Sequence, residues 1–341
     1  SEENKKSEPF SYREKVRIFM VWCDEKQSIY MWRGAYPEAF MSIWTRGDFS
    51  KKVMTDNYRS CQQIQNYSNL LCDETRPLYK EVNDLSSVVM LCTTTANWVS
   101  AVVPYLDKNK RCALLRYSNA NSEIGAKELT EKGVEFTYVP QTPISDITTE
   151  AAWLYNAIAK HFIHPTYSAY DLRDENPNEV VGNKHILQTI KISLKHLDEY
   201  LKQADKDSFA KEVEQLANSL GYSTKDEHCK KVYETICDKK FHPAFNIDGL
   251  QRIAITFHSS KGLEFDQVIL FVSDYTLETE QDICNHYVAA TRAKSKLILV
   301  HISDDGRAAI YVKNIKKILA ESNLTMRKIA TVVDGINGSK Q

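Results

Sequence analysis

Four short clusters along the chain combine side chains that bind phosphate with side chains that stack on flat rings. In the first, DEKQSIYMWRGA at 24–35, Gln27 carries an amide that donates and accepts hydrogen bonds, which suits contact with a phosphate or a water. Tyr30 and Trp32 could stack on exposed bases while Arg33 binds backbone phosphate. From spacing alone, a buried aromatic cluster beside a turn is the favoured interpretation of these residues.

The second cluster, NYRS at 57–60, places Tyr58 beside Arg59. The face of a tyrosine can cover a purine while the neighbouring guanidinium binds phosphate oxygens. Because Tyr-Arg pairs are also common on protein surfaces, this cluster is weak evidence by itself.

The third cluster is TFHSSKGLEFD at 256–266. Glu264 could accept a hydrogen bond from a ribose hydroxyl, as acidic residues do in dinucleotide-binding folds. Thr256 and His258 could hold a nucleic-acid backbone. The alternative interpretation is an ordinary polar turn that carries a surface histidine.

The fourth cluster, HYVAATRAKSKL at 286–297, is expected at a helix end that presents Arg292. An arginine in such a place can neutralise charge that develops on a transferring phosphoryl group. Basic side chains at a helix C-terminus also complement the helix dipole, which is the simpler explanation. The eight cysteines contain no Cys-x-x-Cys pair, so no metal site is predicted.

Alternating strand and helix patterns must position these clusters. A helix is expected from Cys61 to Leu71 with Ser60 as its N-cap, and another ends at Gly133. Strands are expected in six mainly apolar runs, at 15–22, 111–117, 134–139, 252–257, 267–272 and 296–301. This order predicts an α/β fold with a parallel sheet that the late strands share with the earlier ones.

Between about Ile147 and Pro243 the strand pattern disappears and helical periodicity replaces it. Apolar residues recur there at helical spacing, at Ile186, Ile190, Leu194, Leu197 and Leu201. We therefore expect a mainly helical block, inserted between two halves of one sheet, and we interpret the stripe as a packing face.

Length and charge bound the function. At 341 residues the chain is expected to hold two compact units or one unit with a large insertion. Its formal net charge of −1 excludes a polycationic nucleic-acid coat, so any DNA contact must be a local groove. No membrane span or signal peptide is predicted, which favours a cytoplasmic protein. Because the chain starts with Ser and its first strand comes early, we expect it to be part of something longer.

In order, spacing and chemistry the four clusters resemble motifs III, IV, V and VI of superfamily 1A helicases of the UvrD/Rep class. KQSIYMWRGAYPEAF, SCQQIQNYSNL and VPQTPISD further resemble the helicase subunits of Gabija anti-phage defence systems. The resemblance spans roughly residues 15–301 and is faint across the helical block. It implies an ATP-dependent translocase or helicase that acts on single-stranded or unwound DNA, with ATP and Mg²⁺ as cofactors and a Gabija-type nuclease subunit as a partner.

The resemblance also implies a domain plan. Residues 1–55 would be a remnant of the first RecA-like domain, with motif III. Residues 56–146 and 246–320 would be the two halves of RecA-like domain 2A, and 147–245 a helical insertion of 2B type. Residues 321–341 would be a C-terminal tail.

Roles follow residue by residue from the same resemblance. Contacts with ATP fall on Gln27 and Arg59 at the γ-phosphate, Tyr58 at adenine, Glu264 at the ribose, and Arg292 as the arginine finger. Contacts with single-stranded DNA fall on Tyr30, Trp32, Arg33 and His258.

Two parts of the family's catalytic machinery are missing from the sequence. It contains no G-x-x-x-x-G-K-[ST] loop to cradle phosphates, and no upstream Asp-Glu pair to hold Mg²⁺. Cys23 also replaces the glycine that the family usually has in motif III. A larger side chain there changes the geometry of the turn that directs Gln27. We therefore expect no ATPase activity from this chain alone, with most of the phosphate and metal site supplied by a missing N-terminal part.

Two alternatives remain. One is a non-catalytic module, derived from a helicase, that grips DNA or a defence nuclease without hydrolysing ATP. The other is an interaction scaffold with no nucleic-acid role, which requires the four motifs to be coincidences.

Overall fold

The structure is a computed structural model of the 341-residue chain. It describes residues 42, 45–47, 57–73, 75–177 and 184–334. The backbone divides into two compact units, Ser1–Val53 and Met54–Gln341, and the elements below belong to the second. The strand expected at 15–22 and the cluster at 24–35 lie outside the described residues.

A parallel sheet forms the centre of the described part of the second unit. Its seven strands there follow the order β3-β4-β2-β5-β6-β1-β7, and all the pairs are parallel. The strands are β1 Val88–Thr93, β2 Cys112–Arg116, β3 Thr137–Tyr138, β4 Arg252–Thr256, β5 Phe265–Phe271, β6 Ala293–Ile302 and β7 Thr331–Asp334. The central strands are almost wholly buried, which explains their continuous apolar runs.

The late strands join the early ones as predicted. β4 and β5 pair on either side of β2, so the halves of the sheet that precede and follow the helical block are one structure. This confirms the predicted class, an α/β domain with a parallel sheet and a helical insertion. Two strands were not expected: β1, and β7, which pairs with β1. The stretch 321–341, expected as a tail, therefore contributes a strand to the sheet.

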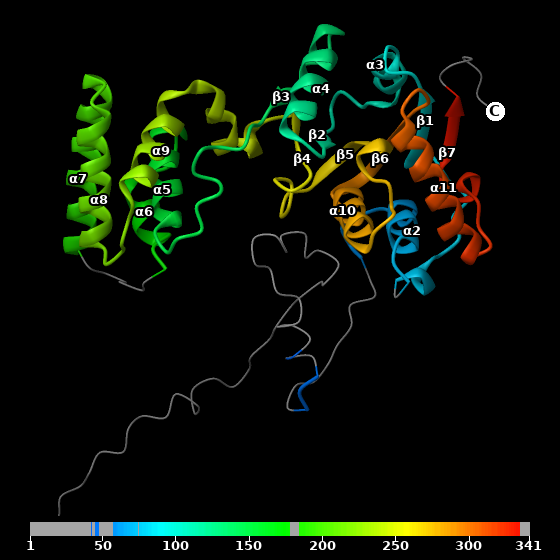
Figure 1. The fold of residues 1–341 in the computed structure, drawn as a ribbon, viewed down its shortest axis with the longest axis horizontal. Helices are drawn as coiled ribbons and strands as arrows, with labels where there is room; N and C mark the ends of the chain where they lie inside the picture. The colour runs from blue at the N-terminus through cyan, green and yellow to red at the C-terminus, as the bar shows by residue number, and fades with distance from the viewer. Residues whose placement is uncertain (1–41, 43–44, 48–56, 74, 178–183, 335–341) are drawn as a thin grey trace, which may run out of the picture. The chain divides into compact units, whose positions relative to one another are not determined.

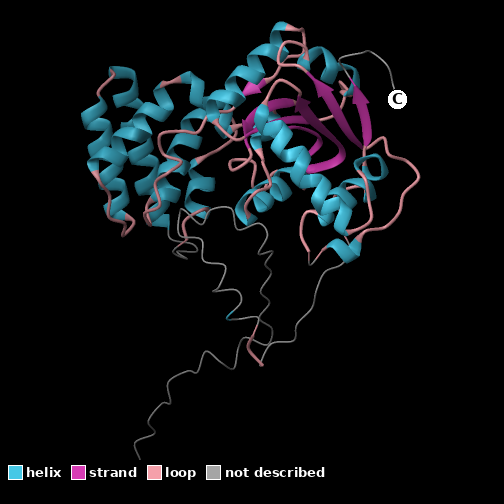
Figure 2. Ribbon diagram, turned by 45° about the vertical axis from the view of Figure 1, so that its right-hand side comes forward, coloured by secondary structure: helices cyan, strands magenta, loops and turns pink. Residues whose placement is uncertain are grey.

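Helices cover both faces of the sheet (Figures 1 and 2). On one face, α3 Trp98–Val102 and α4 Asn119–Glu131 pack on alternate strand residues, among them Leu91, Leu114 and Ile269. On the other side lie α2 Gln62–Leu70, α10 Glu280–Ala290 and α11 Gly306–Glu321. The short helix α12, Met326–Ile329, precedes β7.

Local signals set the ends of α4. The Ser118 hydroxyl caps its start by accepting a hydrogen bond from the amide of Asn121. After Lys132 the chain turns through Gly133 at φ +83°, a conformation that glycine adopts without strain. The predicted end of this helix at Gly133 is thus confirmed.

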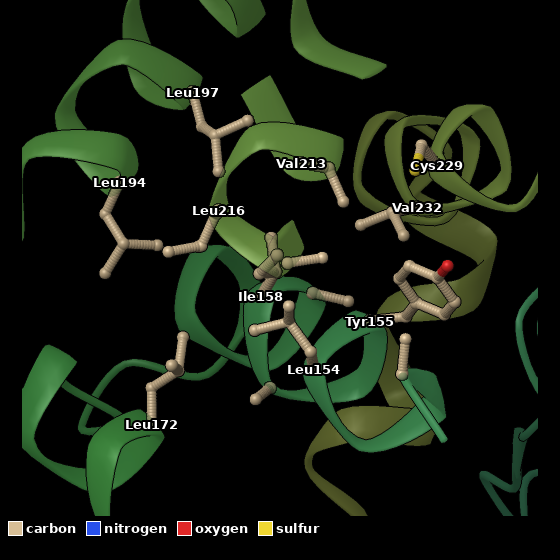
Figure 3. Close-up of a cluster of buried hydrophobic side chains, with 14 of the residues drawn as sticks. Leu154, Tyr155, Ile158, Leu172, Leu194, Leu197, Val213, Leu216, Cys229 and Val232 are labelled. Atoms are coloured by element: carbon tan, nitrogen blue, oxygen red, sulfur yellow. The ribbon is translucent and has the colours of Figure 1, made fainter. Parts of the chain in front are cut away.

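A helical block lies in the chain between β3 and β4. It consists of α5 Ala152–Ile163, α6 Ala169–Asp174, α7 Lys184–Gln203, α8 Lys206–Ser219 and α9 Asp226–Cys237. The block has a core of its own, in which Leu194 and Leu197 of α7 are buried beside Leu216 and Ile158 (Figure 3). The predicted stripe on α7 is therefore a packing face. Among the described helices, none is both long and apolar enough to cross a membrane.

Candidate functional site

The second cluster is fixed to the fourth cluster at the start of β6. The Ser60 hydroxyl donates to the carbonyl of Ala293, at the start of β6, over 2.6 Å. The Asn57 Oδ1 accepts hydrogen bonds from the amides of Arg59 and Ser60, at 2.9 and 3.1 Å. This Asx turn sets the backbone of residues 57–60, and the anchored corner then enters α2.

Two of the predicted nucleotide contacts meet at this corner. The Arg59 Nε lies 2.9 Å from Glu264 Oε2, and the two side chains are 44% and 46% exposed. Lys294 Nζ is 3.7 Å from the other carboxylate oxygen of Glu264. Tyr58, next to Arg59, is 90% exposed. A cation, a hydrogen-bond acceptor and an uncovered aromatic ring therefore share one solvent-accessible place.

Arg292, in contrast, is 2% exposed. Its Nε donates to the carbonyl of Val288 over 3.0 Å, and its Nη1 donates to the carbonyl of Leu263 over 3.2 Å. Its own carbonyl accepts from the amide of Phe265 at 2.9 Å. Arg292 thus joins the last turn of α10 to the backbone on both sides of Glu264, through its side chain at Leu263 and through its own carbonyl at Phe265.

The turn after β4 carries Thr256 and His258. The Thr256 hydroxyl bonds with the amide and hydroxyl of Ser259, at 3.2 and 3.0 Å, so this buried side chain holds the turn together. The partly exposed His258 ring lies against the Phe257 ring, with a centroid separation of 3.8 Å and a tilt of 38° between the ring planes. Tyr117, itself 49% exposed, lies 5.9 Å from the same imidazole. Two flat rings are therefore available side by side at the surface.

A pocket that the sequence analysis missed adjoins Tyr117. It has a volume of about 380 Å³ and is lined by Arg116, Tyr117, Ser118, Asn121, Ser273, Asp274, Asp305 and Arg307. These residues lie at or beyond the carboxyl ends of β2, β5 and β6, where open α/β sheets bind ligands. The polar run directly after the predicted strand 111–117 was the available signal.

An ion pair forms the wall of this pocket. Arg116 Nε lies 2.6 Å from Asp274 Oδ2, both side chains are largely buried, and the guanidinium lies 3.8 Å from the centre of the Phe271 ring. Arg307, at the start of α11, donates to the carbonyl of Ser273 over 2.9 Å and is exposed. The first arginine is thus neutralised by its partner, and the second gives the pocket an accessible cation.

The remaining predicted site residues, Gln27, Tyr30, Trp32 and Arg33, lie outside the described residues. Within the part that is described, no group of three or more His, Cys, Asp or Glu side chains is arranged to hold a metal ion.

Comparison with known proteins finds similarity to helicases. Residues 253–300 match the family model of the UvrD-like helicase C-terminal domain, a stretch that includes all of the third and fourth clusters. Gabija protein GajB from Bacillus cereus strain VD045 is 36% identical over 320 residues, which cover 91% of this chain and 62% of that protein. A probable DNA helicase II homologue from Mycoplasma capricolum is 24% identical over 367 residues, covering 83% of this chain and 51% of that protein.

The chain therefore spans between half and two thirds of the length of these two relatives. A solved structure, the C-terminal domain of a possible DNA helicase from Lactobacillus plantarum WCFS1, is 15% identical and covers 75% of this chain and 94% of that one. Its TM-score of 0.34 is too low to support the assignment. The chain is therefore similar to UvrD-like helicases in residues 253–300, and it is homologous over most of its length to Gabija protein GajB.

Proposed function

We propose that this chain is the C-terminal motor part of an ATP-dependent translocase on single-stranded DNA. The ion pair between Arg59 and Glu264 carries the proposal, because it joins two clusters that are far apart in the sequence. The guanidinium suits the γ-phosphate, the carboxylate suits a ribose hydroxyl, and the exposed ring of Tyr58 suits adenine. When ATP binds, these groups orient it, and ATP supplies the phosphoryl group that is transferred to water.

Arg292 and Gln27 complete the proposed nucleotide contacts. Arg292 directly precedes Ala293, and the carbonyl of Ala293 accepts the hydrogen bond from Ser60. Arg59 and Arg292 are therefore each next to a residue of this hydrogen bond. We assign to Arg292 the stabilisation of charge at the transferring phosphoryl group. The Mg²⁺ ligands and the phosphate-cradling loop would come from residues outside this chain.

The DNA contacts are proposed at the turn after β4 and at the adjoining pocket. His258 and Tyr117 offer ring faces on which bases can stack, and Arg307 offers a cation to a backbone phosphate. Thr256 acts here through the shape of the turn. We also propose Tyr30, Trp32 and Arg33 as contacts with single-stranded DNA.

The homology with GajB supports a place in anti-phage defence. We assign a Gabija-type nuclease subunit as a partner and the cytoplasm as the location. The domain plan, with residues 56–146 and 246–320 as one motor domain, belongs to the same proposal.

ATP hydrolysis by the purified chain, with and without single-stranded DNA, tests the proposal. The measurement is repeated after the missing upstream segment or the genomic neighbour is added. We expect no turnover from the chain alone and DNA-stimulated turnover after complementation. DNA binding without turnover in both cases would instead establish a non-catalytic binding module.

A variant of Arg59, one partner of the ion pair, tests whether ATP is hydrolysed at this site. Arg59→Ala in the complemented protein should abolish turnover, because it removes a cation from the γ-phosphate. Arg76→Ala is the matched control, since Arg76 also bridges distant parts of the chain, with Glu321 at 2.8 Å, but lies outside the proposed site. Equal losses from both variants would contradict the assignment.

A further inference from the structure

Three polar side chains meet in the core beneath the sheet. Tyr67 of α2, His286 of α10 and Tyr311 of α11 are completely buried. The Tyr67 Oη lies 2.5 Å from His286 Nε2 and 2.6 Å from the Tyr311 Oη. Tyr67 is therefore the shared member of two hydrogen bonds that join three helices.

The direction of these hydrogen bonds follows from the state of the histidine. Burial lowers the pKa of His286 to about 3, so its imidazole is neutral and carries one N–H. Its Nδ1 has no hydrogen-bond partner within the described part of the chain. A buried N–H without an acceptor is costly, so the hydrogen belongs on Nε2, which donates to Tyr67. Tyr67 in turn donates to Tyr311.

The same bonds connect the two arginines of the proposed site. The corner at 57–60 is followed by Cys61 and then α2, and α10 ends at Ala290, two residues before Arg292. Tyr67 lies on the first of these helices and His286 on the second. Apolar packing alone is non-directional, whereas a hydrogen bond fixes both the distance and the orientation of the groups that it joins.

We propose that Tyr67 and His286 are positioning residues: their hydrogen bond holds α2 against α10 and thereby sets Arg59 relative to Arg292. The inference rests on the proposed function, in which both arginines contact the nucleotide. Neither residue touches ATP. The contact acts through the two helices.

The test compares Tyr67→Phe with Tyr275→Phe in the complete natural protein. Tyr275 is a matched control because it is also fully buried and its ring lies 4.7 Å from His286. Its hydroxyl has no hydrogen-bond partner in the described structure. Both variants lose one buried hydroxyl, but only the first breaks the contact.

Two readouts are needed. At a temperature well below unfolding, Tyr67→Phe should lower kcat at least about tenfold, because the arginines are misplaced, and change KM for ATP less than about threefold. It should also speed hydrogen exchange of the backbone amides at 57–61 in the protein without nucleotide. Tyr275→Phe should match the unmodified protein in both. A Tyr67→Phe variant with unchanged kcat and exchange would overturn the inference.

A double variant separates positioning from stability. Tyr67→Phe leaves the His286 N–H unpaired, whereas Tyr67→Phe with His286→Leu removes both partners and should recover much of the lost stability. Positioning predicts that kcat stays low in the double variant, and recovery of kcat together with stability would refute it. If the unmodified protein hydrolyses no ATP, the proposed function fails, and the exchange at 57–61 still decides whether Tyr67 positions the corner.

Discussion

At the level of single residues, the two most informative side chains of the proposed site have opposite exposures. Tyr58 has almost no contact with the protein around it, whereas Arg292 is enclosed by backbone carbonyls. An exposed tyrosine contributes little to the stability of the folded state. The role that we propose for Tyr58 is therefore contact with a ligand. A buried arginine serves the fold, whatever else it does.

We expect Tyr58→Ala to weaken the binding of an adenine nucleotide by about 1–3 kcal/mol, the range for loss of an aromatic stack on a base. The stability of the protein should not change. Titration of the complete protein with a fluorescent ATP analogue measures the effect. Tyr170→Ala is the control, since Tyr170 is half-exposed on α6 in the helical block. Equal affinity of the two variants would remove Tyr58 from the nucleotide site.

Arg292→Ala should lower the free energy of unfolding by about 1.5–3 kcal/mol, because charged hydrogen bonds to buried carbonyls are lost. Denaturant unfolding of this chain measures the change. Lys294→Ala, which removes a neighbouring cation with only long, exposed ion pairs, should cost less than about 1 kcal/mol. If the two variants were equally stable, the role of Arg292 would be chemical alone.

At the level of elements, α4 lies so close to β2 that a side chain at Gly125 would displace a residue of the strand. A Cβ added at Gly125 would lie 2.5 Å from Cδ2 of Leu114, a fully buried side chain of β2. Gly125→Ala gains about 1 kcal/mol of helix propensity but forces Leu114 to move, at a cost of about 1–3 kcal/mol. We expect net destabilisation in thermal unfolding.

Gly306→Ala is the control for this effect. Gly306 begins α11, and a Cβ there would meet nothing within 4 Å. The substitution should leave stability unchanged or raise it by up to about 1 kcal/mol. If both alanine variants were stabilised, the space between α4 and β2 would not be limiting.

Elements with a continuous apolar run and a clear boundary were predictable from sequence. β2, β4, β5 and β6 were expected within a few residues because central parallel strands are buried on both faces. β1 was missed because a short apolar run does not by itself distinguish a strand from part of a helix. The insertion of β4 between β2 and β3 is a non-local pairing that no local pattern encodes.

The site was only partly predictable for a related reason. Residue type and motif order predicted Tyr58, Arg59 and Glu264 as nucleotide contacts, but the contact of Arg59 with Glu264 depends on the anchoring of Ser60 to β6. The burial of Arg292 depends on the tertiary contacts of α10. The pocket beside Tyr117 was missed because its residues come from three strand ends and form no single motif.

At the level of the whole molecule, the even balance of charge means that contact with DNA depends on a few local groups. Stability instead depends on buried groups that must stay neutral. The His286 ring is surrounded by three tyrosine rings, those of Tyr67 on α2, Tyr311 on α11 and Tyr275 after β5. Burial raises the pKa of each of these phenols, so they do not titrate in acid.

Acid should therefore destabilise the protein through His286. Its pKa is about 3 in the folded chain and near 6.5 in the unfolded chain, so the unfolded state binds more protons between these values. The stability that comes from a neutral His286 is complete above pH 6.5 and is lost as the pH falls toward 3, with a slope of up to about 1.4 kcal/mol per pH unit. Denaturant unfolding at pH 7, 6, 5 and 4 should show this decline, and His286→Leu should show a shallower one.

Burial also lowers the pKa of His161, His228 and His301, but these histidines are present in both proteins, so their effects cancel in the comparison. Parallel pH curves for the two proteins would mean that His286 is already able to accept a proton in the folded state.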